Sequence, residues 1–189
     1  MTKPNPLLSI AAALLLATPL AAQVGSLSDG TLLDTQAQAP AAQPSSEQIG
    51  DWDLQCETEG PEPRPCSLHQ VVTDDNGSPV IKVTMYRLPE GAKAAAAFTF
   101  IVPQMTYLPH QLTLGLDGVM ANRLPYEYCN QVGCVAQMGI SSIEAEAYKN
   151  GSDYTLTLVS VMAPTQPITL KMSLKGFKEA FDKATPVRQ

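Results

Sequence analysis

From Asp51 onward, apolar and polar side chains alternate with a period of two, and this alternation limits the possible folds more than any other feature of the chain. Trp52 and Leu54 alternate with polar residues, and segments 66–73 and 80–87 repeat the pattern on either side of an Asn-Gly turn. A period of two places apolar side chains on one face of a β-strand, and Asn-Gly supplies the positive φ of a tight hairpin. The pattern predicts antiparallel β-structure.

The rest of the domain continues this pattern with short interruptions. Strands are expected from Trp52 to Cys56 and over residues 66–73, 80–87, 94–102, 112–116, 119–128, 134–140, 154–161 and 168–174. The run 94–102 is apolar apart from Thr99, so we expect it to be buried on both faces or covered by a lid. Its four alanines could open a helix, but its β-branched and aromatic second half favours a strand.

Two short helices are expected beside these strands. Ser141 and Glu144 have the spacing of a capping box, which predicts a helix over 142–149 that ends at Asn150-Gly151. A second helix is expected over 177–184. About nine strands with closely spaced turns and two short helices indicate an all-β, mainly antiparallel fold, either a β-sandwich or a partly closed barrel.

The amino terminus has the organisation of a secretory signal peptide. Lys3 precedes an apolar stretch, and small residues follow at positions 21 and 22, so residues 1–22 are predicted to be cleaved. A membrane anchor would need about 20 apolar residues, whereas residues 7–22 are fewer and contain Pro19. Residues 23–48 are rich in Ala, Gln, Pro and Ser and are predicted to form a flexible linker. The folded domain is expected over 49–185.

Charge excludes some classes of partner. The chain has 12 Lys and Arg against 18 Asp and Glu, a formal net charge of −6, and no polybasic segment. Nucleic acids and anionic lipids recruit clustered basic side chains. We therefore expect no nucleic-acid partner, and the short apolar stretch at the amino terminus predicts no transmembrane anchor in the mature chain.

Four cysteines form two local pairs. An even number in an exported protein predicts disulfides, and of the three possible connectivities we favour Cys56–Cys66 and Cys129–Cys134, because each pair flanks a short turn-forming segment. A redox role is disfavoured because the second pair is C-x4-C rather than C-x-x-C. A zinc site lacks recognisable ligand spacing. We expect structural disulfides and no metal or cofactor.

Several short motifs follow one another along the domain. They are Gly50-Asp51-Trp52, Cys56, Cys66-Ser67-Leu68-His69-Gln70, Leu112-Thr113-Leu114 with Asp117-Gly118, Tyr128-Cys129-Asn130-Gln131-Val132-Gly133-Cys134, and Ser173-Leu174-Lys175-Gly176-Phe177. In this order they resemble the invasion-associated locus B family over nearly the whole domain. The C-N-Q-x-G-C element and the S-L-K-G-F ending are the most specific parts.

The resemblance implies a small exported protein of alphaproteobacterial type, periplasmic or surface-associated. A pathogen member of the family has been linked to entry into red blood cells, but most carriers of the fold are not pathogens. The family has no established enzymatic activity or ligand, so no catalytic residue is carried over to this chain.

Residues that could carry chemistry are few. His69 is expected on a strand face opposite Leu68, and His110 follows Pro109 in a loop. No nucleophile elbow, metalloprotease helix or phosphate-binding glycine loop is present. Three acidic pairs occur, at Asp51 with Asp53, Asp74 with Asp75, and Glu144 with Glu146. We interpret them as structural, and calcium binding at residues 74–75 would need more oxygen ligands.

Binding candidates lie in two segments. The connection 103–109 carries Met105, Tyr107 and Leu108, which are predicted either to form an exposed apolar contact or to pack as a lid. A second set, Tyr126, Tyr128, Asn130 and Gln131, surrounds the second cysteine pair and could present hydrogen bonds to a partner. Trp52, the only tryptophan, is expected to pack in the core.

Together these features predict a non-enzymatic periplasmic protein, or a secreted or surface-associated one, that binds a protein or envelope component through disulfide-held loops. One alternative is a periplasmic hydrolase that uses loop carboxylates and a histidine. Another is a structural or stress-related envelope protein without a dedicated ligand. The sequence identifies neither the partner nor the oligomeric state.

Overall fold

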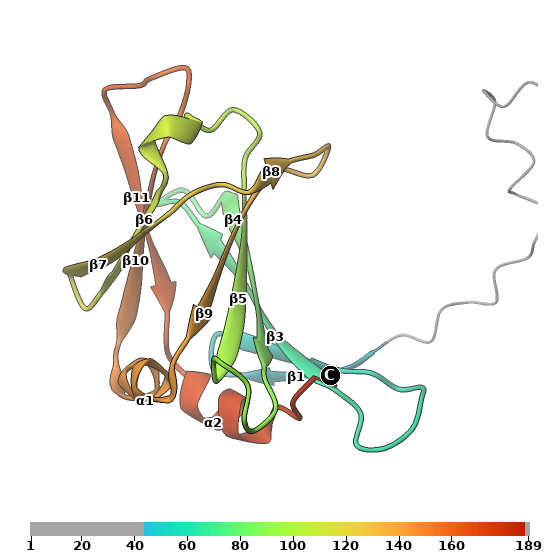
Figure 1. Cartoon of the computed structure of the whole chain (residues 1–189). Coiled ribbons are helices and arrows are strands. Elements are labelled where there is room, and N and C mark those ends of the chain that lie inside the picture. Colours follow the sequence, from blue (N-terminus) through green and yellow to red (C-terminus); the bar gives the residue numbers. More distant parts are fainter. Residues whose placement is uncertain (1–43, 188–189) are drawn as a thin grey trace, which may run out of the picture. The chain divides into compact units, whose positions relative to one another are not determined.

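Two antiparallel β-sheets pack face to face in the folded domain (Figure 1). The structure is a computed structural model that describes residues 44–187, apart from the side chains of residues 120 and 121. The predicted signal peptide, residues 1–22, and residues 23–43 of the predicted linker lie outside the described residues. The all-β antiparallel fold predicted from the sequence is confirmed, and the architecture is a two-sheet sandwich.

The larger sheet has the strand order β1-β2-β3-β4-β5-β9-β8, and the smaller has the order β11-β10-β6-β7. The larger sheet comprises β1 (Ser45–Ile49), β2 (Trp52–Cys56), β3 (Cys66–Thr73), β4 (Pro79–Arg87), β5 (Ala96–Val102), β8 (Tyr128–Cys129) and β9 (Cys134–Ile140). The smaller sheet comprises β6 (Leu112–Leu116), β7 (Val119–Leu124), β10 (Asp153–Val159) and β11 (Pro167–Ser173). All paired strands are antiparallel, and central strands such as β3 and β5 bury every second side chain.

Three expectations about the strands need correction. The domain begins earlier than expected, because the predicted linker residues 45–48 pair with β2 as part of β1. The segment 119–128, expected to be one strand, breaks after Leu124 and crosses to the larger sheet, where it becomes β8. Strand β5 is fully buried only on its inner face, since its outward residues are half-buried.

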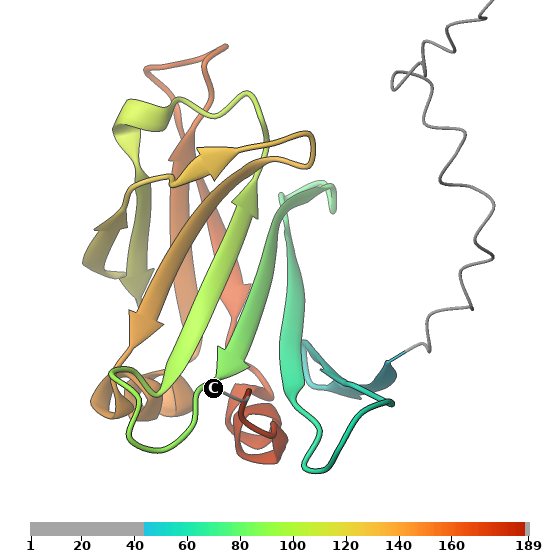
Figure 2. The same ribbon diagram turned by 45° about the vertical axis from the view of Figure 1, so that its right-hand side comes forward.

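Both predicted helices are present and lie together at one end of the sandwich, which we call the helical end (Figure 2). Helix α1 (Ser142–Asn150) starts with the expected capping box: the Glu144 amide donates to Ser141 Oγ, and the Ser141 amide donates to Glu144 Oε2. Helix α2 (Phe177–Lys183) follows β11 directly. The ring of Phe177 packs against Trp52, Phe98, Tyr148 and Phe181, so aromatic side chains fill this end of the core.

The two sheets are joined by hydrogen bonds at a point that we call the sheet junction, formed by residues 50–52, Gln70 and residues 173–177. The buried side chain of Gln70, on β3, donates from Nε2 to the carbonyls of Asp51 and Ser173 and accepts from the Ser173 amide, each at 3.0 Å. The indole of Trp52 also donates to the Ser173 carbonyl at 3.0 Å. One glutamine thus links the turn before β2 in the larger sheet to the end of β11 in the smaller sheet.

Two glycines allow the backbone segments of the sheet junction to touch. Gly50 and Gly176 have φ of +61° and +85°, and a Cβ on Gly176 would lie 2.2 Å from the carbonyl oxygen of Ile49. The Asp51 amide donates to the Lys175 carbonyl across the same contact. Since only glycine combines a positive φ with so close a backbone approach, the turn after β1 and the turn before α2 depend on these residues.

We predict that Gly176→Ala lowers the free energy of unfolding by about 2 to 3 kcal/mol, because a new methyl group meets backbone atoms that cannot move aside. Urea unfolding followed by circular dichroism measures the change. The matched control is Gly77→Ala, in the β3–β4 turn, which has φ of +79° and open space around its Cβ. Equal losses in the two variants would contradict the close contact at the sheet junction.

Candidate functional site

Both favoured disulfides are present, one at each end of the sandwich. Cys56 bonds Cys66 and Cys129 bonds Cys134, and the half-cystines of each pair stand directly opposite each other on neighbouring strands. The first bridge closes the loop between β2 and β3, beside the helical end. The second closes the tight turn between β8 and β9, at the opposite end. The predicted connectivity is confirmed.

The turn inside the Cys129–Cys134 bridge is held by its own polar groups. The side-chain oxygen of Asn130 accepts hydrogen bonds from the amides of Val132 and Gly133, and the Asn130 amide donates to the Gly133 carbonyl. Asn130 is exposed, but its carboxamide oxygen is already engaged within the turn. It therefore shapes this turn more than it offers a free acceptor to a partner.

The connection between β5 and β6 reaches the same end and is fixed to two neighbours. Its residue Gln104 donates from Nε2 to the Asn130 carbonyl at 2.7 Å, which ties it to the disulfide turn. Thr106 is buried and forms an isolated bridge with Ser160, on the connection between β10 and β11. Backbone hydrogen bonds flank that bridge, from the Tyr107 amide to Val159 and from the Val161 amide to Met105.

We call these three connections, residues 103–111, 130–133 and 159–166, the loop end. Large apolar side chains protrude from it even though its backbone is tied down. Met162 is 78% exposed and Met105 54% exposed, and Tyr107, Leu108, Val161 and Val132 are also exposed. Segment 103–109 was expected either to form an exposed apolar contact or to pack as a lid. In the structure Met105, Tyr107 and Leu108 are exposed, and the buried Thr106 anchors the segment.

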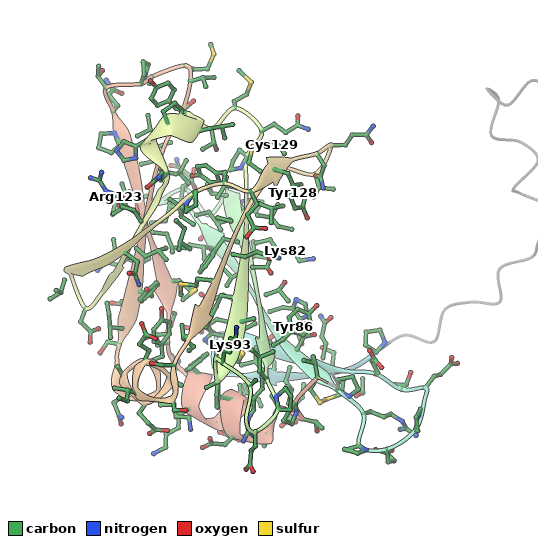
Figure 3. The ribbon with its side chains drawn as sticks, viewed as in Figure 1. Lys82, Tyr86, Lys93, Arg123, Tyr128 and Cys129 are labelled. Atoms are coloured by element: carbon green, nitrogen blue, oxygen red, sulfur yellow. A yellow bond between two sulfur atoms is a disulfide. The ribbon has the colours of Figure 1, made fainter. Side chains whose placement is uncertain are left out.

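The structure separates the four residues expected around the second disulfide. Tyr128 and Gln131 are exposed, and Figure 3 shows Tyr128 beside Cys129 on β8. Tyr126 is half-buried, its hydroxyl has no hydrogen-bond partner among the described residues, and burial raises its pKa to about 12. The expected cluster is thus one exposed tyrosine, one exposed amide, the turn-forming Asn130 and a phenol packed against the core.

Sequence reasoning missed three exposed apolar residues of the loop end. Val161 was expected at the end of a strand, Met162 lay in an unassigned connection, and Val132 appeared only as a turn residue. Strand β10 ends at Val159, so the next residues leave the sheet. Pro164 and Pro167 are the sequence signal that the chain has left the sheet here. Proline cannot donate a hydrogen bond within a strand pair and is found between strands or at the start of one.

His69 lies, as expected, on the strand face opposite Leu68, and its ring contacts two hydroxyls. Ser67 Oγ lies 2.8 Å from Nε2, and Thr84 Oγ1 lies 3.2 Å from Nδ1. Burial lowers the pKa of His69, and the nearby Lys82 ammonium lowers it further, whereas Asp53 opposes the shift. The imidazole is therefore held neutral as a link between two hydroxyls.

Ser67 and His69 do not complete a hydrolytic site. A hydroxyl and not a carboxylate faces Nδ1, so the imidazolium formed on proton transfer would lack the partner that orients and stabilises it. Ser67 also sits within a strand paired on both sides, by β2 and by β4. Its neighbouring backbone donors are used in the sheet, whereas an oxyanion hole needs donors that are free.

The other polar candidates support local structure. Asp74 Oδ1 accepts from the amides of Asn76 and Ser78, so it stabilises the β3–β4 turn as expected. His110 ends the short 3₁₀ helix η2 (Leu108–His110) within the loop end, where Nδ1 lies 3.3 Å from the Gln111 carbonyl. Within residues 44–187, no three His, Cys, Asp or Glu side chains come together as metal ligands. No helix in this part of the chain is long and apolar enough to cross a membrane.

Comparison with known proteins places the fold and the motifs in one family. The family model described as "Invasion associated locus B (IalB) protein" matches residues 52–185. The chain belongs to the invasion associated locus B family. Its resemblance to this family, inferred from the motifs, is confirmed.

Relatives and a solved structure agree with this assignment. Two invasion protein B homologues of Brucella abortus, from strain 2308 and from biovar 1 strain 9-941, are each 24% identical over 133 residues, covering 70% of this chain and 75% of theirs. The crystal structure of invasion associated protein B from Bartonella henselae matches with a TM-score of 0.61 at 20% identity. That match covers 74% of this chain and 94% of the other chain. At 20% identity, the match is evidence that the two proteins share a fold.

The invasion associated locus B motifs have structural roles in this chain. Gly50-Asp51-Trp52, Gln70 and Ser173-Leu174-Lys175-Gly176-Phe177 come together at the sheet junction. The Cys-Asn-Gln-Val-Gly-Cys element forms the disulfide turn. The motifs on which the resemblance rested therefore build the sandwich and its disulfide turn, and most of the exposed apolar side chains of the loop end lie outside them.

The neutral state of His69 predicts a pH dependence of stability. Its folded pKa lies below the ordinary value of 6.5, so the unfolded chain binds a proton more readily, and lowering the pH from about 7 to about 5 favours unfolding. Above about pH 7 this contribution to the pH dependence disappears. We expect His69→Gln, measured by urea unfolding, to lose less stability over this range than the unsubstituted protein. An identical decline in both proteins would contradict the prediction.

Proposed function

We propose that this protein is an exported, non-enzymatic binding protein of the bacterial envelope or its surroundings, and that the loop end is its contact surface. The observation that carries the proposal is the loop end itself, in which exposed apolar side chains stand on connections tied together by Gln104, the Thr106–Ser160 bridge and the Cys129–Cys134 disulfide. Apolar groups that cluster at one rigid end of a domain indicate an interaction site.

Two further observations support this function. Two disulfides in a small domain are typical of proteins that work outside the cytoplasm, where thiols oxidise. The Brucella relatives are named as invasion protein homologues, and the solved Bartonella structure carries the name invasion associated protein B; none is named as an enzyme. A contact role fits these names better than a hydrolytic one.

A photo-crosslinking amino acid placed in the chain tests the contact surface in the native cell. We expect crosslinked products from position 162 or 105, which protrude from the loop end. The matched control position is 143, because Ile143 on α1 is 84% exposed at the helical end. Products from position 143 alone would contradict the proposal. Products from none of the three positions would favour a structural envelope protein without a dedicated ligand.

The two disulfides provide a second test, because only one of them supports the loop end. We expect the Cys129→Ser/Cys134→Ser variant to lose about 2 kcal/mol of stability and most of its crosslinking at position 162. The Cys56→Ser/Cys66→Ser variant is the control: it loses a bridge at the far end and keeps crosslinking per folded molecule. Equal crosslinking in the two variants would show that the second bridge does not support the contact surface.

Replacing His69, which lies on β3 outside the loop end, separates the proposal from a hydrolase that uses this histidine. His69→Gln is expected to leave the crosslinking pattern unchanged. A loss of turnover of an envelope substrate in this variant would instead support hydrolysis.

A further inference from the structure

The loop end contains no Asp, Glu, Lys or Arg, although the whole chain has 12 basic and 18 acidic residues. Its three connections read Pro-Gln-Met-Thr-Tyr-Leu-Pro-His-Gln, Asn-Gln-Val-Gly and Val-Ser-Val-Met-Ala-Pro-Thr-Gln. His110 is the one histidine among them. A surface of this size without charge is unusual in an acidic protein and limits what can cover it, since a charged partner would find no opposite charge here.

Polar groups of the loop end are largely paired with one another. Thr106 Oγ1 donates to the Pro103 carbonyl, and the amides of Ala163 and Met162 donate to the carbonyl and the hydroxyl of Ser160. In η2, the amides of His110 and Gln111 donate to the carbonyls of Tyr107 and Leu108. A backbone that satisfies its own hydrogen bonds can leave water without the cost of unpaired groups, which is the condition for contact with lipid.

Charged side chains resume behind the loop end. Arg123 lies on β7, Glu127 lies on the segment that crosses between the sheets, and Asp74 and Asp75 lie in the β3–β4 turn. In Figure 3, the labelled cations Lys82, Lys93 and Arg123 all lie below the loop tips in that view. The acidic turn is set back from the tips in Figure 2. Carboxylates at this depth repel anionic head groups and leave neutral ones unaffected.

We infer that the loop end inserts into the interfacial region of a lipid bilayer with neutral head groups. This inference rests on the proposed function and names a lipid bilayer as the partner of the contact surface. Met105, Leu108, Val161 and Met162 enter the boundary of the acyl chains, and Tyr107 lies at the head-group level, where an aromatic ring with a polar end is favoured. The attachment is shallow and reversible, because a few apolar side chains carry it.

A bilayer fits the loop end better than a protein partner does. Protein interfaces contain about one hydrogen bond per 100–200 Å², whereas the backbone donors noted above are already used within the loops. A bilayer interface requires that apolar side chains protrude and that the backbone beneath them be paired, and the exposed methionines and the backbone hydrogen bonds named above provide both.

Flotation with protein-free phosphatidylcholine vesicles tests the inference. The probe is the protein recovered in soluble form from cells that express the whole chain. We expect it to float with the vesicles, and we expect Met105→Gln/Met162→Gln to lower the partition coefficient about tenfold or more. Ile143→Gln, at the helical end, is the matched control and is expected to change it less than twofold.

Lipid charge and salt provide the second arm of the experiment. Partitioning is expected to vary less than twofold between about 0.1 and 1 M NaCl and not to rise when phosphatidylglycerol is added. Binding that requires phosphatidylglycerol and is lost in salt would overturn the inference. So would an equal loss in Ile143→Gln and the double methionine variant.

Tryptophan fluorescence reports which end enters the bilayer, because Trp52 is fully buried and gives a constant background. The emission of Met162→Trp is expected to shift to shorter wavelength on addition of phosphatidylcholine vesicles, and that of Ile143→Trp is expected to stay unchanged. If the protein fails to float while position 162 crosslinks to a protein in the cell, the lipid inference fails and the proposed function stands. If neither occurs, both fail.

Discussion

The hydrogen bonds of the Gln70 carboxamide are the constraint on which the rest of the structure depends. A β-sandwich is held mostly by apolar packing, which is not directional and does not fix how one sheet sits on the other. Gln70 adds direction, because it bonds to Asp51 in the turn between β1 and β2 of the larger sheet and to both backbone groups of Ser173 in the smaller one. The close approach of Gly50 and Gly176 and the buried ring of Trp52 complete this contact.

The two ends of the domain are closed in different ways. Beside the sheet junction, α2 and α1 close one end with an aromatic core around Phe177. At the other end, within residues 44–187, three connections bond to one another and leave apolar side chains exposed. Aromatic packing is thus concentrated at the helical end, whereas the loop end is held by hydrogen bonds and the Cys129–Cys134 disulfide.

Much of the fold could be predicted from the sequence because alternation and local turns are local signals. The disulfides followed from short loops between the cysteines, and the capping box gave the start of α1. Strand β1 was missed because its residues Ser-Ser-Glu-Gln carry no apolar alternation and are held by backbone pairing with β2. The role of Gln70 was missed because its partners are far away in the chain, and such proximity is invisible in a single sequence. The exposure of Met162 was missed although the prolines that follow it were a local signal.

Native-state hydrogen exchange at the Ser173 amide tests the central claim most directly, since this amide donates to Gln70 Oε1 at 3.0 Å across the sheets. If the sheet junction holds the sandwich together, this amide exchanges only when the whole domain unfolds, with the same free energy as the amides between β4 and β5. Exchange of Ser173 through a local opening of much lower free energy, while those core amides remain protected, would show that the sheets stay together without Gln70.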